Sequence, residues 1–149
     1  MNDPVTLLQD GRRREREQAL FYRLLASDAE ESGDEALAER LNGLLADEQH
    51  HVSRLTARLL ELGERPSDAS SSLVVPDLTS WEAVARVREE NEVTWYERAV
   101  HEVADEETLA MLREILASER HHHEELAGKW MPAGTTDPTA ERAESGEAS

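Results

Sequence analysis

Residues 45–51 read LADEQHH and residues 116–123 read LASERHHH, so one phrase occurs twice in the chain. In each copy a glutamate precedes a histidine by three positions, as Glu48 and His51 and again as Glu119 and His122. The chain holds 24 Glu and 6 His among 149 residues. Composition alone therefore produces about one such string. The two strings are informative only if their surroundings also match.

The residues that lead up to the two strings do match. Asp34 lies 14 positions before Glu48, and Asp105 lies 14 positions before Glu119. Asp is a preferred residue at a helix N-terminus, so each string lies on a helix that begins at the same distance before it. The apolar positions coincide as well, in the pairs Leu41 and Leu112, Leu44 and Ile115, and Leu45 and Leu116.

A second part of the repeat lies further upstream in each half. Glu15 stands seven positions before Tyr22, and Glu89 stands seven positions before Tyr96. Each half of the chain thus pairs a helix carrying a glutamate with a helix carrying Glu-x-x-His. We interpret this as a duplicated helical hairpin, which composition does not readily produce by accident.

Length and charge limit the classes of protein that need to be considered. A chain of 149 residues is typical of one domain, and a net charge of −17 argues against nucleic acid and anionic membranes as partners. The absence of cysteine excludes disulfides, iron–sulfur clusters and thiol catalysis, so a bound metal would need oxygen and nitrogen ligands. The sequence shows neither a signal-peptide order nor a membrane-spanning apolar run, so we expect a cytoplasmic protein.

Long segments without proline, rich in Ala, Leu, Glu and Arg, predict four helices. Asp3 and Pro4 begin the first, which runs to about residue 31. Gly33 suits a left-handed turn before a second helix over about 35–62, which stops at Gly63. The third is expected to run from a capping box at 79–82 to about 104, and the fourth from Asp105 to about Trp130.

Short turns within each half make the paired helices antiparallel neighbours. The two prolines and the serine run of residues 64–79 predict an extended crossover between the halves, with an apolar patch at 73–75 that packs on the bundle. The sequence therefore predicts an all-α four-helix bundle of two antiparallel pairs joined by one long crossover. It occupies residues 1–131, and residues 132–149 form a disordered acidic tail.

Helical spacing directs one carboxylate from each helix into the core: Glu15, Glu48, Glu89 and Glu119. Four facing carboxylates would be very costly, because each loses hydration and like charges repel. Two divalent cations remove both costs, since their charge balances four carboxylates while two histidines add neutral imidazoles. Iron or manganese suits such oxygen-rich ligation better than copper or zinc does.

Several assignments have more than one interpretation. Glu92 is either a further ligand or a surface acid. Glu89 is favoured over its neighbour Glu90 by the alignment of the two halves. Tyr22 and Tyr96 either pack in the core with a bonded hydroxyl or serve the metals in a redox role. His50, His121 and His123 lie beside the ligands and are expected to face solvent or to lie just outside the ligand set. His101 falls off the stripe and is given no role.

A glutamate on the first and third helices with Glu-x-x-His on the second and fourth resembles the ferritin-like di-iron carboxylate superfamily. Residues 4–130 share this pattern, and Glu89-x-x-Glu92 is most similar to its rubrerythrin and erythrin branch. The resemblance implies that Glu48 and Glu119 bridge two metals. It further implies terminal ligands at each end of the pair: Glu15, His51, Glu89, His122 and, as an extra carboxylate, Glu92.

The resemblance also implies a function. We expect two iron ions, with manganese as the alternative, and a di-iron oxidoreductase in which the reduced pair reacts with peroxide or dioxygen. An iron-binding ferroxidase or storage subunit is the second interpretation, and a metal-free structural bundle is the third. The lack of rubredoxin-type cysteines implies an external electron-donor protein. Superfamily habit implies a homodimer, and Gln18, opposite Glu92 in the repeat, implies an asymmetric site.

Overall fold

The computed structural model describes residues 3–68 and 72–129, which contain four α-helices and no strand. The helices are α1 (Pro4–Glu31), α2 (Glu35–Glu61), α3 (Trp81–Ala99) and α4 (Glu106–Glu124). The all-α four-helix bundle predicted from the sequence is confirmed. Among the described helices, none combines the length and apolar character needed to cross a bilayer.

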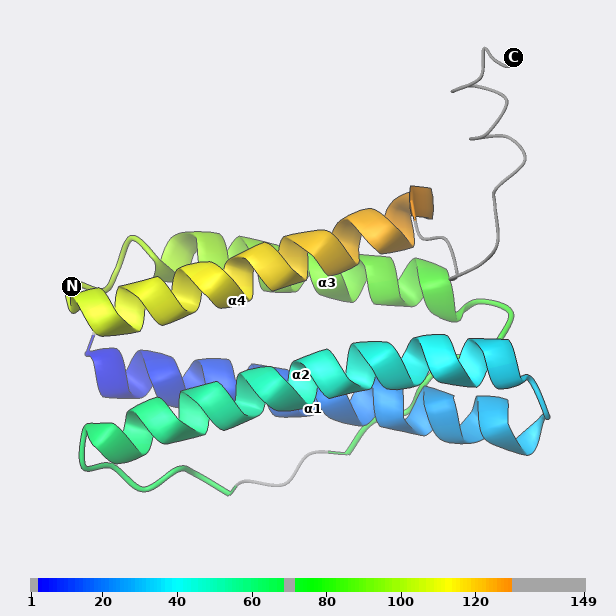
Figure 1. Cartoon of the computed structure of the whole chain (residues 1–149), viewed down its shortest axis with the longest axis horizontal. Helices are drawn as coiled ribbons and strands as arrows, with labels where there is room; N and C mark the ends of the chain where they lie inside the picture. The colour runs from blue at the N-terminus through cyan, green and yellow to red at the C-terminus, as the bar shows by residue number, and fades with distance from the viewer. Residues whose placement is uncertain (1–2, 69–71, 130–149) are drawn as a thin grey trace, which may run out of the picture.

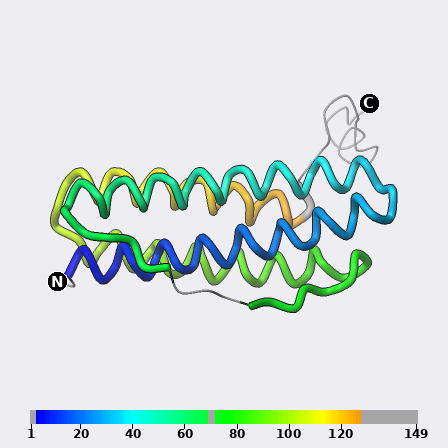
Figure 2. Tube along the Cα trace, turned by 90° about the horizontal axis from the view of Figure 1, so that it is seen from below, coloured from blue at the N-terminus to red at the C-terminus, as the bar shows by residue number. Residues whose placement is uncertain are grey.

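The helices form two antiparallel hairpins that stack as two layers, α1 with α2 and α3 with α4 (Figure 1). The connection from α2 leaves one end of the bundle and reaches the start of α3 at the other end (Figure 2). This path makes α1 antiparallel to α3 and brings their middles together. The predicted single long crossover is confirmed.

The predicted helix starts are confirmed at three aspartates. Asp3 accepts a hydrogen bond from the Val5 amide at 3.2 Å, and Asp34 accepts one from Leu37 at 3.1 Å. Asp105 accepts from the amide of Thr108 at 2.9 Å. Each side chain satisfies an amide that the first turn of a helix leaves without a backbone partner.

The predicted capping box at the start of α3 is wrong. Ser80 is the N-cap residue but makes no side-chain cap. The Thr79 hydroxyl donates instead to Asp77 Oδ1 at 2.6 Å, and Glu82 pairs with Arg40 of α2 at 2.8 Å. Asp77 Oδ1 also accepts from the Thr79 amide at 3.0 Å, so Asp77 takes the backbone donor that the capping box would have paired with Glu82.

The last two helices end before the predicted residues. After Ala99, the amides of His101 and Glu102 bond three residues back, which tightens the chain into a turn five residues before the predicted end at 104. In the last helix, α4 passes at Glu124 into a π-helical turn over Glu125–Lys129. Trp130 and the predicted tail at 132–149 lie outside the described residues.

The predicted apolar patch of the crossover packs on the bundle in part. Leu73 and Val75 are half-buried against the core, whereas Val74 between them is 97% exposed. Alternation of this kind is expected of an extended segment, whose successive side chains point in opposite directions.

The apolar core consists of two clusters at opposite ends of the bundle. One includes Leu8, Leu55, Leu112 and Ile115, and the other includes Leu25, Leu41 and Trp81. A layer of buried acids and histidines lies between them at mid-length. The two apolar clusters hold the four helices in register on either side of this layer.

Two glycines, one within α2 and one just after its end, provide a test of the local geometry. Gly63 follows the helix with φ of +81°, where an added Cβ is strained, whereas Gly43 lies within the helix with open space around it. We expect Gly63→Ala to lower the free energy of unfolding by about 1–2 kcal/mol. Gly43→Ala should raise it by about 0.5–1 kcal/mol. Urea unfolding monitored by circular dichroism measures both, and two changes of the same sign would contradict the assigned helix end.

Candidate metal centre

The seven residues predicted as ligands all lie in the polar layer, and none is more than 6% exposed. α1 supplies Glu15 and α3 supplies Glu89 and Glu92, while α2 and α4 each supply a glutamate and the histidine three positions later. Residues three or four apart share a helix face, so the stripe that packs the core also presents these polar groups. Glu90 is exposed, as the alignment of the two halves predicts.

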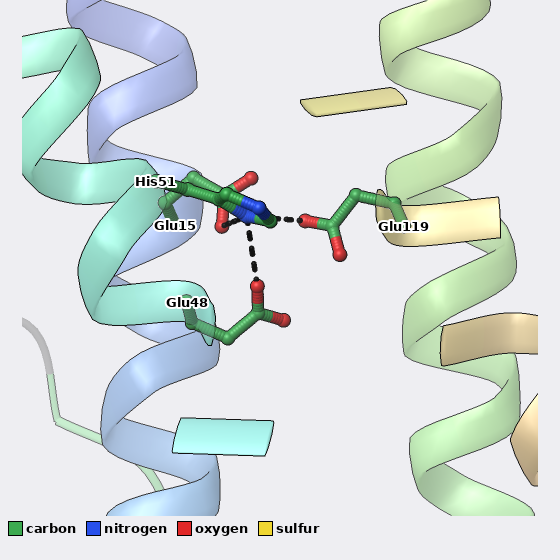
Figure 3. A group of neighbouring side chains, drawn as sticks. All are labelled: Glu15, Glu48, His51 and Glu119. Atoms are coloured by element: carbon green, nitrogen blue, oxygen red, sulfur yellow. Dashed lines mark hydrogen bonds and ion pairs between the residues drawn. The ribbon is translucent and has the colours of Figure 1, made fainter. Parts of the chain in front are cut away.

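One group of ligand atoms comes from Glu15, Glu48, His51 and Glu119, all within 4.8 Å of one another. Figure 3 shows three carboxylates converging on the imidazole of His51. Its Nδ1 lies 3.1 Å from Glu48, 3.3 Å from Glu15 and 3.6 Å from Glu119. A single ring nitrogen thus faces three carboxylates from three helices.

A second group comes from Glu48, Glu89, Glu119 and His122, again with ligand atoms within 4.8 Å. The Nδ1 of His122 lies 3.1 Å from Glu119, 3.7 Å from Glu89 and 3.8 Å from Glu48. Glu48 and Glu119 belong to both groups. The shared glutamates are the two that the resemblance implies as bridging ligands, and metal ligation itself stays a prediction.

Four carboxylate oxygens in the described part of the chain are buried yet accept no hydrogen bond: Glu48 Oε1 and Oε2, Glu89 Oε1 and Glu119 Oε2. Each lies between 3.1 and 3.8 Å from an imidazole nitrogen, but one Nδ1 donates a single proton and cannot satisfy three carboxylates. Buried polar atoms without partners are costly and rare in folded proteins. Their oxygen and nitrogen chemistry fits a pair of divalent cations such as iron or manganese.

The pKa values reflect the same cost of burying several carboxylates close together. Burial, together with the charge of Glu119, raises the pKa of Glu15 from 4.5 to about 7, and burial raises that of Glu48 well above its usual range. Burial alone would lower the pKa of His51, but the carboxylates of Glu119 and Glu15 raise it to about 10. The carboxylates around His122, Asp47 first, likewise overcome its burial and raise its pKa.

Both tyrosines are fully buried and bind carboxylates across the α1–α3 interface. The Tyr22 hydroxyl donates to Glu89 Oε2 at 2.6 Å, and the Tyr96 hydroxyl donates to Glu15 Oε2 at 2.6 Å. Each hydrogen bond occupies one carboxylate oxygen and so fixes the direction in which the second oxygen of that glutamate points. Both tyrosines therefore pack in the core with a bonded hydroxyl, which lies beside the candidate metal centre.

Glu92 is buried but belongs to neither group of ligand atoms, because Arg14 of α1 holds its carboxylate at 3.0 Å. Burial raises the pKa of Glu92 to about 8 against the opposing charge of Arg14. At the repeat-related position, Gln18 donates to Glu89 Oε2 at 3.2 Å and accepts from Arg88 at 2.6 Å. The two arginines were not predicted, although they occupy equivalent positions one residue before Glu15 and Glu89.

A further contact missed from the sequence orients His122. Its Nε2 lies 2.9 Å from Asp47 Oδ2, a side chain of α2 that is 56% exposed. The repeat places Ser118 where the equivalent aspartate for His51 would stand. The sequence signal for this contact is the residue directly before the glutamate of each Glu-x-x-His string, which is Asp47 in the first string and Ser118 in the second. The remaining histidines stay on the outer side: His50, His101 and His121 are exposed, and His123 is half-buried.

The chain matches no protein-family model, and no curated protein matches it in sequence. Solved structures do match. Bacterioferritin BfrA of Mycobacterium tuberculosis is 21% identical in two structures, with TM-scores of 0.76 and 0.77, covering 86% and 87% of this chain and 84% of the other. A ferritin-like, diiron-carboxylate protein of Bacillus anthracis str. Ames is 20% identical, with a TM-score of 0.68 over 86% of this chain and 98% of that one. These likenesses show that the chain has the ferritin-like fold.

The buried acids predict how the stability of the metal-free protein depends on pH. The pKa of Glu15 is raised from 4.5 to about 7. The contribution of Glu15 to the free energy of unfolding is therefore fully present below about pH 4.5 and is lost as pH rises through 7. We expect Glu15→Gln to flatten the decline in free energy of unfolding over this interval. Urea titrations from pH 4.5 to 8 measure it.

Glu39→Gln is the matched control, because it removes the same charge from an exposed position on α2. It should leave the pH dependence unchanged. Equal slopes for the original chain and Glu15→Gln would contradict the burial of an ionisable carboxyl at this position.

Proposed function

We propose that the chain binds a pair of iron ions in its polar layer and that the reduced pair reacts with dioxygen or peroxide. The observation that carries the proposal is the set of buried, unpartnered carboxylate oxygens in two ligand groups that share Glu48 and Glu119. Without a metal, these buried oxygens lose their hydration and gain no hydrogen-bond partner, whereas two cations would bind all of them.

Charge supports a pair of metals over a single ion. Four carboxylates carry four negative charges, which two divalent cations balance while two imidazoles remain neutral. Glu15 with His51 would hold one ion and Glu89 with His122 the other, with Glu48 and Glu119 between them. A reduced iron pair supplies electrons to an oxidant, and the two apolar clusters on either side keep bulk water away.

Iron is favoured over manganese by the proteins that share the fold. One is a bacterioferritin and another is described as a diiron-carboxylate protein. The bacterioferritin among these proteins supports the second candidate function, in which the same centre oxidises Fe(II) for storage. A rubrerythrin-like peroxidase is a more specific form of the first candidate, with peroxide as the oxidant. It requires Glu92 as a further ligand, and Arg14 competes for that carboxylate.

The remaining expectations about partners are part of the proposal. An external one-electron donor protein would return the oxidised centre to its reduced state, since the chain has no cysteine to hold a rubredoxin-type iron. A homodimer is proposed as the functional assembly, with the active pair inside each subunit. The chain would then act as a di-iron oxidoreductase of peroxidase or ferroxidase type.

Anaerobic loading with Fe(II) tests the metal pair. We expect two irons per chain and, after addition of air or peroxide, the near-ultraviolet absorption of an oxo-bridged ferric pair. Glu48→Ala and Glu119→Ala should each lose both, because each removes a ligand shared by the two ions. Metal analysis after gel filtration gives the stoichiometry, and stopped-flow absorbance gives the reaction.

Glu39→Ala, exposed on the same helix as Glu48, is the control and should load two irons. Iron content in Glu48→Ala and Glu119→Ala equal to that of the original chain would contradict the metal centre. A large Fe(II) excess separates the two candidates: a storage protein retains many irons per chain in a cage-sized assembly, whereas the oxidoreductase stays near two in a small oligomer.

The hydrogen bond from His122 to Asp47 should tune metal affinity. A carboxylate behind an imidazole fixes its tautomer and raises its basicity, and removal of such a partner typically costs 10–100-fold in affinity. We expect Asp47→Ala to weaken iron binding by about that factor. Ser118→Ala, at the repeat-related position, should leave affinity unchanged. Competition with a coloured chelator measures both, and equal affinities for the two variants would contradict the role of Asp47.

A further inference from the structure

Arg14 and Arg88 occupy the same position in the two halves of the repeat, directly before the ligand glutamate of α1 and of α3. Each reaches across to the other helix and binds the residue three positions after the ligand glutamate there. Arg14 binds Glu92, with Nη2 3.0 Å from Oε2 and Nε 3.3 Å from Oε1. Arg88 binds the amide oxygen of Gln18 at 2.6 Å. The same contact therefore occurs twice, with a carboxylate in one half and an amide in the other.

An aromatic ring fixes each of these guanidinium groups as well. The Cζ atom of Arg14 lies 5.5 Å from the ring centroid of Trp95, and that of Arg88 lies 4.6 Å from the ring centroid of Phe21. Trp95 and Phe21 are again equivalent positions of the repeat. A planar guanidinium matches both oxygens of a carboxylate, which the single ammonium of a lysine cannot do. Arg14 thus binds both oxygens of Glu92 in a fixed orientation.

Glu92 lies beside the candidate metal centre and yet outside its ligand set. It is 6% exposed, and burial raises its pKa to about 8 against the charge of Arg14. The carboxylates of Glu15 and Glu119 add to this rise. Both of these glutamates belong to the group of ligand atoms around His51, whereas Glu92 belongs to neither group. A buried acid next to the centre is therefore bound by an arginine and not grouped with the ligands.

The charge balance of the centre gives this pairing a consequence. Four ligand carboxylates and two divalent cations sum to zero, whereas a fifth carboxylate would leave one negative charge. The guanidinium of Arg14 supplies a matching positive charge for Glu92, so this acid is neutralised without a metal. A buried carboxylate that loses its partner is strongly destabilised. Removal of Arg14 would therefore leave a bound metal ion as the cation for Glu92 to bind.

We propose that Arg14 is a positioning residue, which withholds Glu92 from the metal pair and so keeps a coordination position open on the ion of the His51 group. This role of Arg14 rests on the proposed function, because an open position has meaning only on a bound metal. Such a position gives dioxygen or peroxide access to an iron. In the other half, the neutral amide of Gln18 donates to Glu89 at 3.2 Å. Arg14 therefore decides between a centre of four carboxylates and a centre of five.

Cobalt(II) tests the role of Arg14 in the full chain without a redox step. It accepts the same oxygen and nitrogen ligands as iron(II). Its visible absorption per ion becomes weaker as its coordination number rises. Arg14→Gln should weaken the absorption per cobalt, because the released Glu92 adds a ligand, and should tighten cobalt binding by about tenfold. An absorption titration gives the spectrum, and equilibrium dialysis gives the affinity and the expected two ions per chain.

Arg88→Gln is the matched control, because it removes the same charge from the equivalent position but releases only the neutral amide of Gln18. It should leave the absorption per cobalt unchanged. Glu92→Gln should also leave the absorption unchanged, and it reproduces the arginine–glutamine contact that the other half already contains. In the double variant of Arg14→Gln and Glu92→Gln, the absorption per cobalt should return to that of the original chain.

Urea unfolding of the metal-free protein tests the pairing independently of any metal. Arg14→Gln should lower the urea midpoint, since it leaves a buried carboxylate without its cation. Adding Glu92→Gln should restore part of the loss, because residues in contact do not act additively. Additive effects of the two substitutions would overturn the pairing of Arg14 with Glu92.

The cobalt spectra separate the role of Arg14 from the proposed function. Equal absorption per cobalt in Arg14→Gln and the original chain would overturn the role of Arg14 and leave the metal pair intact. Stronger absorption in Glu92→Gln would also overturn it, because Glu92 would then already bind a metal; this comparison decides the matter even if Arg14→Gln does not fold. Failure of the original chain to bind cobalt or iron would overturn the proposed function, and the role of Arg14 with it.

Discussion

The burial of four carboxylates and two imidazoles at the middle of a helical bundle is the constraint on which the rest of this structure depends. It divides the apolar core into two clusters, one on each side of the polar layer. It also explains why the groups around the layer are donors: Tyr22 and Tyr96 each give a hydroxyl proton to a glutamate, and Arg14 neutralises Glu92. Hydrogen bonds to charged acceptors are stronger than neutral ones, so these contacts offset part of the cost of burial.

The internal repeat places equivalent residues around each half of the centre, and its departures make the halves different. Gln18 takes the place of a second Glu92, so one half has an extra carboxylate nearby and the other has a neutral amide. Asp47 supports His122, while Ser118 stands in that position for His51. Two metal ions bound here would experience different charge and different histidine basicity. The asymmetry expected from Gln18 thus extends to the groups outside the ligand set.

Local signals allowed much of the fold to be predicted from the sequence. Asp caps, left-handed glycines and the spacing of apolar residues act within one helical turn, so the starts of α1, α2 and α4 followed directly. The start of α3 did not, because Asp77 competes for the Thr79 hydroxyl and that competition depends on the path of the crossover. The same limit applies to the site. The inward faces of the helices were readable, but the pairing of Arg14 with Glu92 depends on two helices meeting, which spacing along one helix cannot show.

A structural bundle alone is a poor explanation for this layer. The repeat already uses leucine two turns earlier on the same faces, at Leu41 and Leu112, where the side chains are fully buried. Replacing buried charged groups by apolar residues of similar size is often neutral or stabilising, so stability by itself would favour continuing the leucine stripe. The chain instead keeps Glu48 with both carboxylate oxygens buried and without hydrogen-bond partners. A ligand that binds only the folded state offsets such a cost by an amount that grows with the logarithm of its affinity, so the proposed metal pair would make the polar layer compatible with a stable fold.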